Sequence, residues 1–369
     1  MAENEKVSEV VAPLIQIALL FLITFSQLGV TLIPAILEWV EKSDAEPLRV
    51  VREQDMNIRH FAISFRSQVQ TFFDDHSVDV DDPRQPFDAL WHVDEPVSFV
   101  GREQYPEFQA EEVDARLVHR VLIGASAMIL PGEMVFSEEV YCCGPLLCGD
   151  RTAFRALFSE HGITLGDECV VVRWLHSDGT VQIGERSQLF GRLSANRKAI
   201  IGRDCEFERM SSPIIQFSSS SVRRGKPVVR EDWPPPSDIE VIDHRTWRSG
   251  GDIVVDESSS VKFNLIAKKM IRLGIQVEIC GDLKAHDTLE IGAGSIIRGA
   301  IVSRGPICIG DDCLVKGPVI SETAIEIASG CVIGTPGMPT TVSAPRITAA
   351  CGTQVSGSIW ATVEGRVSE

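Results

Sequence analysis

The strongest constraint on the fold is a six-residue period of apolar side chains between residues 253 and 333. Each period holds two residues that lie two positions apart, so both point to the same side of a short strand. Neither a helix nor a flat sheet keeps this spacing. Three residues separate successive pairs, and glycine and polar residues are frequent there, which suits a corner. Ten successive pairs are Val277/Ile279, Leu283/Ala285, Leu289/Ile291, Ser295/Ile297, Ile301/Ser303, Ile307/Ile309, Cys313/Val315, Val319/Ser321, Ile325/Ile327 and Cys331/Ile333.

Three such strands close one coil of 18 residues, and stacked coils form a β-solenoid with an apolar interior. We therefore predict an all-β fold, a triangular β-helix, whose handedness the period leaves open. The predicted core includes Ile279, Ile291, Ile297, Ile309, Val315, Ile327 and Ile333. The predicted corner glycines are Gly191, Gly281, Gly299, Gly317 and Gly357.

The same period appears earlier in the chain, which indicates two solenoid blocks. Pairs from Ile163/Leu165 to Cys205/Phe207 keep it, and pairs between Met128 and Cys148 keep it with a shift of one residue. We predict a first block over residues 121–210, with a helical excursion near residues 150–161 that explains the shift. A Ser/Pro-rich insertion over residues 211–252 has no period, and a second block follows over residues 253–369.

The N-terminal region predicts a membrane anchor. After a polar N-terminus (residues 1–9), no charged residue occurs from Val10 to Leu37, whereas about 20 apolar residues suffice to span a bilayer. We predict a transmembrane helix over residues 10–40, with a re-entrant or interfacial segment as the alternative. Basic residues favour the cytoplasmic side, which places the C-terminal body in the cytoplasm. They are Lys6 before the segment and Lys42, Arg49, Arg52 and Arg59 after it.

Residues 41–120 are predicted to form a juxtamembrane helix and a connector. Apolar residues between Leu48 and Phe72 recur at helical spacing, so this helix would pack on the domain or on a partner helix, or lie on the lipid surface. Residues 74–120 show no clear period.

Charge and cysteine content exclude some classes of function. A net charge of −17 argues against nucleic-acid binding. The ten cysteines form no CxxC pair, so we predict neither a metal site nor a bound cofactor. Cys169, Cys205, Cys313 and Cys331 share one place in the 18-residue frame, which predicts small buried side chains and a reducing compartment.

The glycine corners, each followed by an alternating strand, and the turn Ile291–Gly294 resemble the bactofilins, a bacterial polymer-forming cytoskeletal family. The resemblance is clearest over residues 253–335, good over 163–207 and absent from the first 120. It implies a right-handed triangular β-helix that assembles end to end into filaments at the bacterial inner membrane and recruits envelope proteins. The long N-terminal portion, the excursion and the insertion depart from the family pattern. These departures argue against filaments, because inserted loops or a capped end would block stacking. We place Cys351 and Trp360 at an end contact from their position in the last coil.

The main alternative is an enzyme of the hexapeptide acyltransferase type, which also has 18-residue coils and uses a histidine base. His176 and His286 are the candidates, although a solvated surface position is the ordinary interpretation of each. The carboxylates Asp167, Glu168, Asp204, Asp311 and Asp312 fall in turns, where Asp commonly accepts backbone hydrogen bonds. A further alternative is an accessory subunit of a membrane polysaccharide or envelope assembly complex.

Overall fold

The computed structural model describes residues 58–80, 86–91, 95–102, 105–218, 231–234 and 239–369, and a few helical residues between Leu19 and Gly29. The chain divides into two compact units, Met1–Met56 and Asn57–Glu369. In the first unit, the described side chains of Leu22 and Phe25 are 71% and 69% exposed. No helix within the described ranges has the length and apolar character needed to cross a bilayer. Most of the anchor predicted over residues 10–40 lies outside these ranges.

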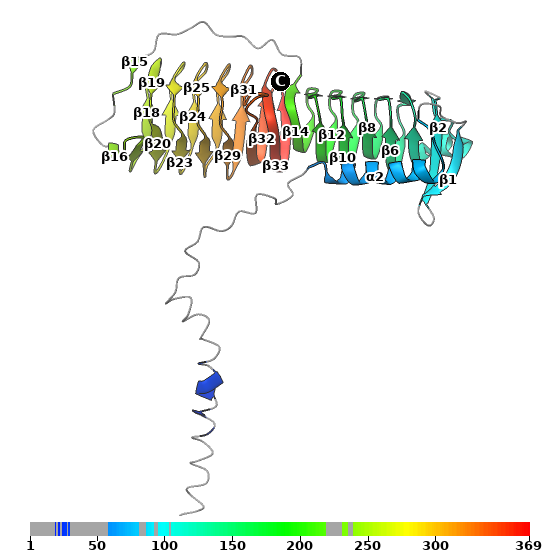
Figure 1. Ribbon diagram of the computed structural model, residues 1–369. Coiled ribbons are helices and arrows are strands. Elements are labelled where there is room, and N and C mark those ends of the chain that lie inside the picture. Colours follow the sequence, from blue (N-terminus) through cyan, green and yellow to red (C-terminus); the bar gives the residue numbers. More distant parts are fainter. Residues whose placement is uncertain are drawn as a thin grey trace, which may run out of the picture. The chain divides into compact units, whose positions relative to one another are not determined.

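The second unit is a β-solenoid of about 13 turns, which confirms the predicted solenoid (Figure 1). The strands of its first block are β3 (Leu117–Val118), β4 (Val121–Gly124), β5 (Met128–Leu130), β6 (Val135–Cys142), β7 (Pro145–Cys148), β8 (Ala153–Ser159), β9 (Gly162–Leu165), β10 (Val170–Ser177), β11 (Thr180–Ile183), β12 (Gln188–Ala195), β13 (Lys198–Ile201) and β14 (Glu206–Phe217).

The second block contains shorter strands until its last two coils. They are β17 (Thr246–Ser249), β18 (Ile253–Val255), β19 (Ser259–Val261), β20 (Asn264–Ala267), β21 (Ile271–Leu273), β22 (Glu278–Ile279), β23 (Leu283–Ala285), β24 (Leu289–Ile291), β25 (Ile296–Ile297), β26 (Ile301–Ser303), β27 (Ile307–Ile309), β28 (Leu314–Val315), β29 (Val319–Ser321), β30 (Ala324–Ile327), β31 (Val332–Ile333), β32 (Thr340–Ala350) and β33 (Gln354–Ser368).

Parallel pairing between successive coils follows the 18-residue period. Leu283 of β23 pairs with Ile301 of β26, which pairs with Val319 of β29. The seven predicted core residues are buried, none more than 4% exposed. The predicted corner glycines also have a steric reason, because a Cβ on Gly317 would lie 2.3 Å from the carbonyl oxygen of Gly299. Gly357 has a φ of +125°, which side chains rarely tolerate.

The helical excursion predicted near residues 150–161 is wrong, because these residues continue the coil as strand β8. Two residues separate the buried Phe154 and Leu157, whereas three separate Val171 and Leu175 in the next coil, and the ladder shows a register shift there. This one-residue deletion at a corner accounts for the shifted period. It also places apolar side chains three and four residues apart, which mimics a helix.

The insertion predicted over residues 211–252 is narrower than expected. Residues 211–217 complete β14, and β17 pairs with β20 of the second block. Between them, β15 (Glu231–Asp232) pairs with β19, and β16 (Ile239–Asp243) forms a hairpin with β17. Residues 219–230 and 235–238 lie outside the described ranges. Serine and proline content obscured the strands at both ends of this segment.

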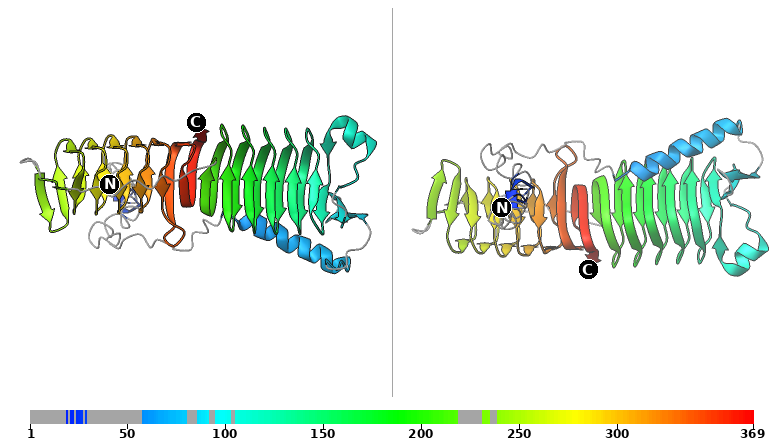
Figure 2. Two further views of the ribbon diagram at one scale, coloured as in Figure 1. Left: turned by 90° about the horizontal axis from the view of Figure 1, so that it is seen from above. Right: turned by 90° about the horizontal axis from the view of Figure 1, so that it is seen from below.

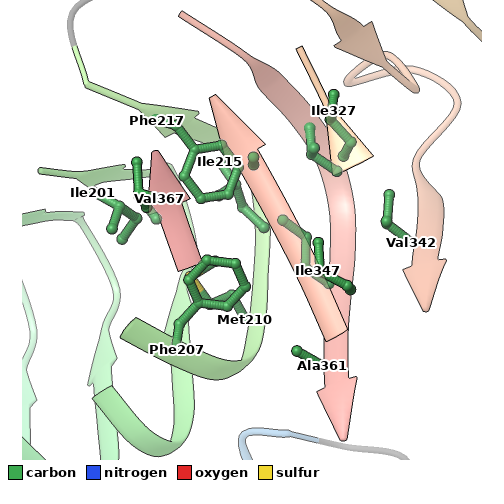
Figure 3. Close-up of a cluster of buried hydrophobic side chains, with 14 of the residues drawn as sticks. Ile201, Phe207, Met210, Ile215, Phe217, Ile327, Val342, Ile347, Ala361 and Val367 are labelled. Carbon is green, nitrogen blue, oxygen red and sulfur yellow. The ribbon is translucent and has the colours of Figure 1, made fainter. Parts of the chain in front are cut away.

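The two blocks meet through their last coils and run in opposite directions. Strand β14 pairs antiparallel with β33, with Phe207 opposite Gly365, Met210 opposite Ile359 and Ile215 opposite Val355. Figure 3 shows side chains from both blocks in one apolar interior at this joint. The first coils of both blocks therefore face outward, at opposite ends of the column in Figure 1.

Each outer end holds an aromatic side chain against the core. At the first block, the hairpin of β1 (Phe87–Trp91) and β2 (Glu95–Gly101) extends the sheet next to β4, and α3 (Ala110–Ala115) lies beside β3. Phe108 packs against Phe136 with ring centroids 6.2 Å apart. At the second block, Trp233 is 6% exposed and belongs to the core.

Helix α2 (His60–Asp75) lies along the first block (Figure 2). Its buried residues Ala62, Phe65, Val69, Phe72 and Phe73 form a second apolar cluster with outward-facing side chains of the solenoid. Of the alternatives for the juxtamembrane helix, packing on the domain is therefore confirmed for residues 60–75. Residues 47–57 of the predicted helix lie outside the described ranges.

Candidate functional site

The solenoid face under α2 carries a polar cluster that includes the candidate residue His176. Tyr141, Phe158, His176 and Ser194 stand at matching positions of successive coils and point outward. His176 is only 3% exposed. Its Nδ1 lies 2.7 Å from Ser194 Oγ, and its Nε2 lies 3.3 Å from Asp178 Oδ1. The expectation of a solvated His176 is thus wrong, because α2 covers a face that the strand pattern alone leaves open.

Arg66 fixes the helix to this face. Its two terminal nitrogens donate to Asp178 Oδ2 at 2.8 Å and to Glu160 Oε1 at 3.2 Å. The hydroxyl of Tyr141 donates to the same Glu160 oxygen at 2.5 Å. The guanidinium also lies 5.7 Å from the centre of the Phe158 ring. One arginine of α2 thus links carboxylates from two successive coils.

The protonation state of this cluster follows from burial. Desolvation lowers the pKa of His176, partly opposed by its hydrogen bond to Asp178, so the imidazole is neutral near pH 7. Desolvation and the hydrogen bond to Glu160 raise the pKa of Tyr141. His176 thus bridges Ser194 and Asp178, and Asp178 in turn accepts a hydrogen bond from Arg66 of α2.

His286 lies far along the chain, at a half-buried corner of the second block. Its backbone N–H donates to the carbonyl of Ala267 in the preceding coil at 3.2 Å. The structure does not bring His286 together with His176, because the two residues belong to different blocks.

The corner carboxylates connect successive coils. Asp167 Oδ1 accepts the backbone N–H of Glu185 at 2.8 Å, and Asp311 Oδ1 accepts that of Ser329 at 3.1 Å. Glu168 forms an ion pair with Arg186 at 3.0 Å. Asp204 and Asp312 occupy left-handed corners, with φ of +54° and +55°. Across the described residues, no three His, Cys, Asp or Glu side chains are placed to share a metal ion.

The predicted cysteine column lies inside the solenoid. Cys169, Cys205, Cys313 and Cys331 are at most 1% exposed. Their thiols donate to glycine carbonyls, for example Cys205 to Gly184 at 3.0 Å and Cys331 to Gly310 at 3.1 Å. Burial raises the pKa of Cys205 to about 12, so this thiol stays protonated. The column satisfies backbone acceptors at one corner, which is a structural role.

The contact surface of β33 is the feature that sequence reasoning missed. Trp360 does lie in an end contact, but its partner is Arg209 of the same chain, whose guanidinium is 5.7 Å from the ring centre. Near Cys351, the N–H of Gly352 donates to the carbonyl of Phe217 at 2.8 Å. A signal existed in β32 and β33, of 11 and 15 residues, which exceed the short strands of the preceding coils.

Comparison with known proteins adds no assignment to this geometry. The chain matches no protein-family model, and no curated protein or solved structure is significantly similar to it.

Proposed function

We propose that this protein is a membrane-anchored β-helical scaffold that organises envelope-related partners. The observation that carries the proposal is the joint between β14 and β33, which unites two solenoid blocks into one continuous column. Strand pairing on every face and a shared apolar interior make such a column stiff. A stiff column with binding surfaces along its sides suits a spacer or an assembly platform.

The joint also restricts how copies of this protein could associate. The last coils of the two blocks are already paired with each other through β14 and β33, so the strand edges of these coils are occupied. End-to-end growth would use the outer ends, where β1 exposes Leu90 and β16 exposes Val241, each at 63%. We propose that copies join through these ends into filaments, as the resemblance to bactofilins suggests.

We propose residues 10–40 as the anchor in a bacterial inner membrane, with the solenoid in the cytoplasm. The uncharged run from Val10 to Leu37 and the basic residues that follow it support this orientation. The exposed apolar side chains of Leu22 and Phe25 are consistent with a lipid environment. The acyltransferase alternative gains no support from His176, whose ring is buried beneath α2.

Electron microscopy of the full chain in mild detergent tests the scaffold. We expect straight columns that join end to end, and L90D/V241D is expected to leave single columns because charge blocks both outer ends. The matched control is I320D, at a side-facing residue of β29 that is 40% exposed and paired with strands on both sides. Compact trimers of parallel columns would contradict the proposal and favour an acyltransferase-like assembly.

Membrane extraction tests the anchor separately. The full chain is expected to stay with membranes after alkaline carbonate treatment, whereas a chain without residues 10–40 is expected to be released. Release of the full chain would exclude a transmembrane anchor.

A further inference from the structure

Arginines and exposed apolar side chains gather where α2 begins on the first block. We define the arginine-aromatic patch as Phe61, Val172, Arg173, Phe190, Arg192 and Arg209. Strand pairing aligns two of the arginines on the face that carries α2, because Arg192 of β12 lies between Trp174 of β10 and Arg209 of β14. The 18-residue offset of these strands places Val172 beside Phe190, at the corner that precedes Trp174 and Arg192.

The apolar members of the patch are open to solvent. Phe61 is 44% exposed, Val172 is 53% exposed and Phe190 is 40% exposed. Ile63, on the next turn of α2, is 52% exposed. Large apolar side chains on neighbouring elements indicate a surface that contacts something other than water.

Aromatic rings position the arginines. The Arg192 guanidinium lies 4.8 Å from the centre of the Phe61 ring, and that of Arg209 lies 5.7 Å from Trp360. Arg173 is half-exposed and approaches Glu139 at 4.0 Å. Glu139 and Glu208 are the acids near these arginines, and the Glu208 carboxylate accepts the backbone N–H of Gly191 at 3.1 Å. Three arginines outnumber these two acids. The patch is therefore basic on a chain whose net charge is −17.

We propose that the arginine-aromatic patch docks the solenoid on an anionic lipid surface. Arginine beside aromatic and aliphatic side chains fits a bilayer interface, since the guanidinium binds lipid phosphates while the apolar groups enter the acyl boundary. The charge of the patch, opposite to that of the whole chain, selects an acidic bilayer as the occupant. The docking rests on the proposed membrane location and adds a second, electrostatic contact to the anchor.

Vesicle flotation tests this docking with residues 57–369, a compact unit whose described core includes no residue of the first unit. We expect flotation with phosphatidylcholine vesicles that contain about a third phosphatidylglycerol, and little with phosphatidylcholine alone. High salt is expected to weaken the binding because it screens the charges. Equal binding to both kinds of vesicle, or none to either, would overturn the proposal.

Variants then locate the contact. R192E/R209E is expected to weaken binding to acidic vesicles by roughly tenfold or more, since each charge near the surface contributes measurably. R197E/R304E, which changes two exposed arginines elsewhere, is expected to bind as the parent does. R192K/R209K keeps the charge and should retain most of the binding. Equal loss in both reversed variants would assign the binding to overall charge and overturn the site.

The apolar half of the patch has its own variant, so that misfolding is not mistaken for lost binding. V172S/F190S is expected to weaken flotation several-fold at an unchanged melting temperature, and unchanged binding would overturn the insertion of these side chains. Failure of the anchor is distinguishable, because the anchor is tested by carbonate extraction of the full chain, whereas docking is tested with residues 57–369, which lack the anchor.

Discussion

Gly365 lies directly opposite Phe207 in the antiparallel joint, where a Cβ on Gly365 would come within 2.1 Å of the phenyl ring. The ring is 2% exposed and lies in the interior that the two blocks share (Figure 3). Close approach of a glycine and an aromatic ring is thus part of what joins the blocks.

Substitution of this glycine is expected to weaken the joint. Gly365→Ala should destabilise the protein by about 1–3 kcal/mol because it forces the Phe207 ring out of its position. Gly337→Ala is the control, since an added Cβ there meets no atom within 4 Å. Thermal unfolding followed by circular dichroism measures both variants. Equal melting temperatures would contradict the prediction, because they would show that the joint accommodates the added Cβ at position 365.

A charge in the core is expected to unfold the second block. Ile309 is 2% exposed in β27, so Ile309→Asp would bury a carboxylate without a partner and cost more than about 4 kcal/mol. Val254→Asp changes a side chain that is 52% exposed and should leave stability nearly unchanged. Chemical denaturation compares the two variants, and similar midpoints would refute the inward assignment of Ile309.

Loss of an aromatic anchor should release α2 and leave the solenoid folded. Phe65 is buried against the rings of Trp91, Tyr141 and Trp174, with centroids 5.6 to 6.0 Å away. Phe65→Ala is expected to weaken this packing by about 3 kcal/mol. Hydrogen exchange should become faster in residues 60–75 and stay slow in the coils. Ile63→Ala, at an exposed position of the same helix, serves as the control.

His176 is expected to make stability depend on pH. Its pKa is lowered by burial in the folded state, so the unfolded chain binds a proton that the folded chain does not. The associated stability is complete above the unfolded pKa of about 6.5 and is lost as pH falls towards the folded value. Melting temperatures between about pH 7 and 5 should fall less steeply for His176→Gln. A slope equal to that of the parent would contradict this linkage.

Thiol reactivity should separate the cysteines by position. Cys280 is exposed, whereas Cys142 and Cys205 are buried and burial raises the pKa of each to about 12. Alkylation of the native protein is therefore expected to modify Cys280 first, because the thiolate is the reactive form. Mass spectrometry of partially labelled protein checks the order, and early labelling of Cys205 would contradict the closed corner.

The sequence by itself determined the coil. A pair of inward residues every six positions predicts a three-sided coil, and side chains such as Ile279, Ile309 and Ile333 are buried as the period predicts. The period also placed Gly299 and Gly317 at corners, and the structure gives the steric reason, because neighbouring coils leave no room for a Cβ there. These features are local, because they depend on the residues of each strand and corner.

Only the tertiary structure decided the direction of the second block and the covering of the first. A coil has the same inward pattern whether its strands pair parallel or antiparallel with those of the next coil. The sequence around Met210 and Ile359 therefore does not predict that these two residues pair. Likewise, the strand pattern places Tyr141, Phe158 and His176 on the outside of the coil, and only the position of α2 shows that they are buried. Contacts between segments far apart in the chain depend on long-range packing, which a periodic pattern does not encode.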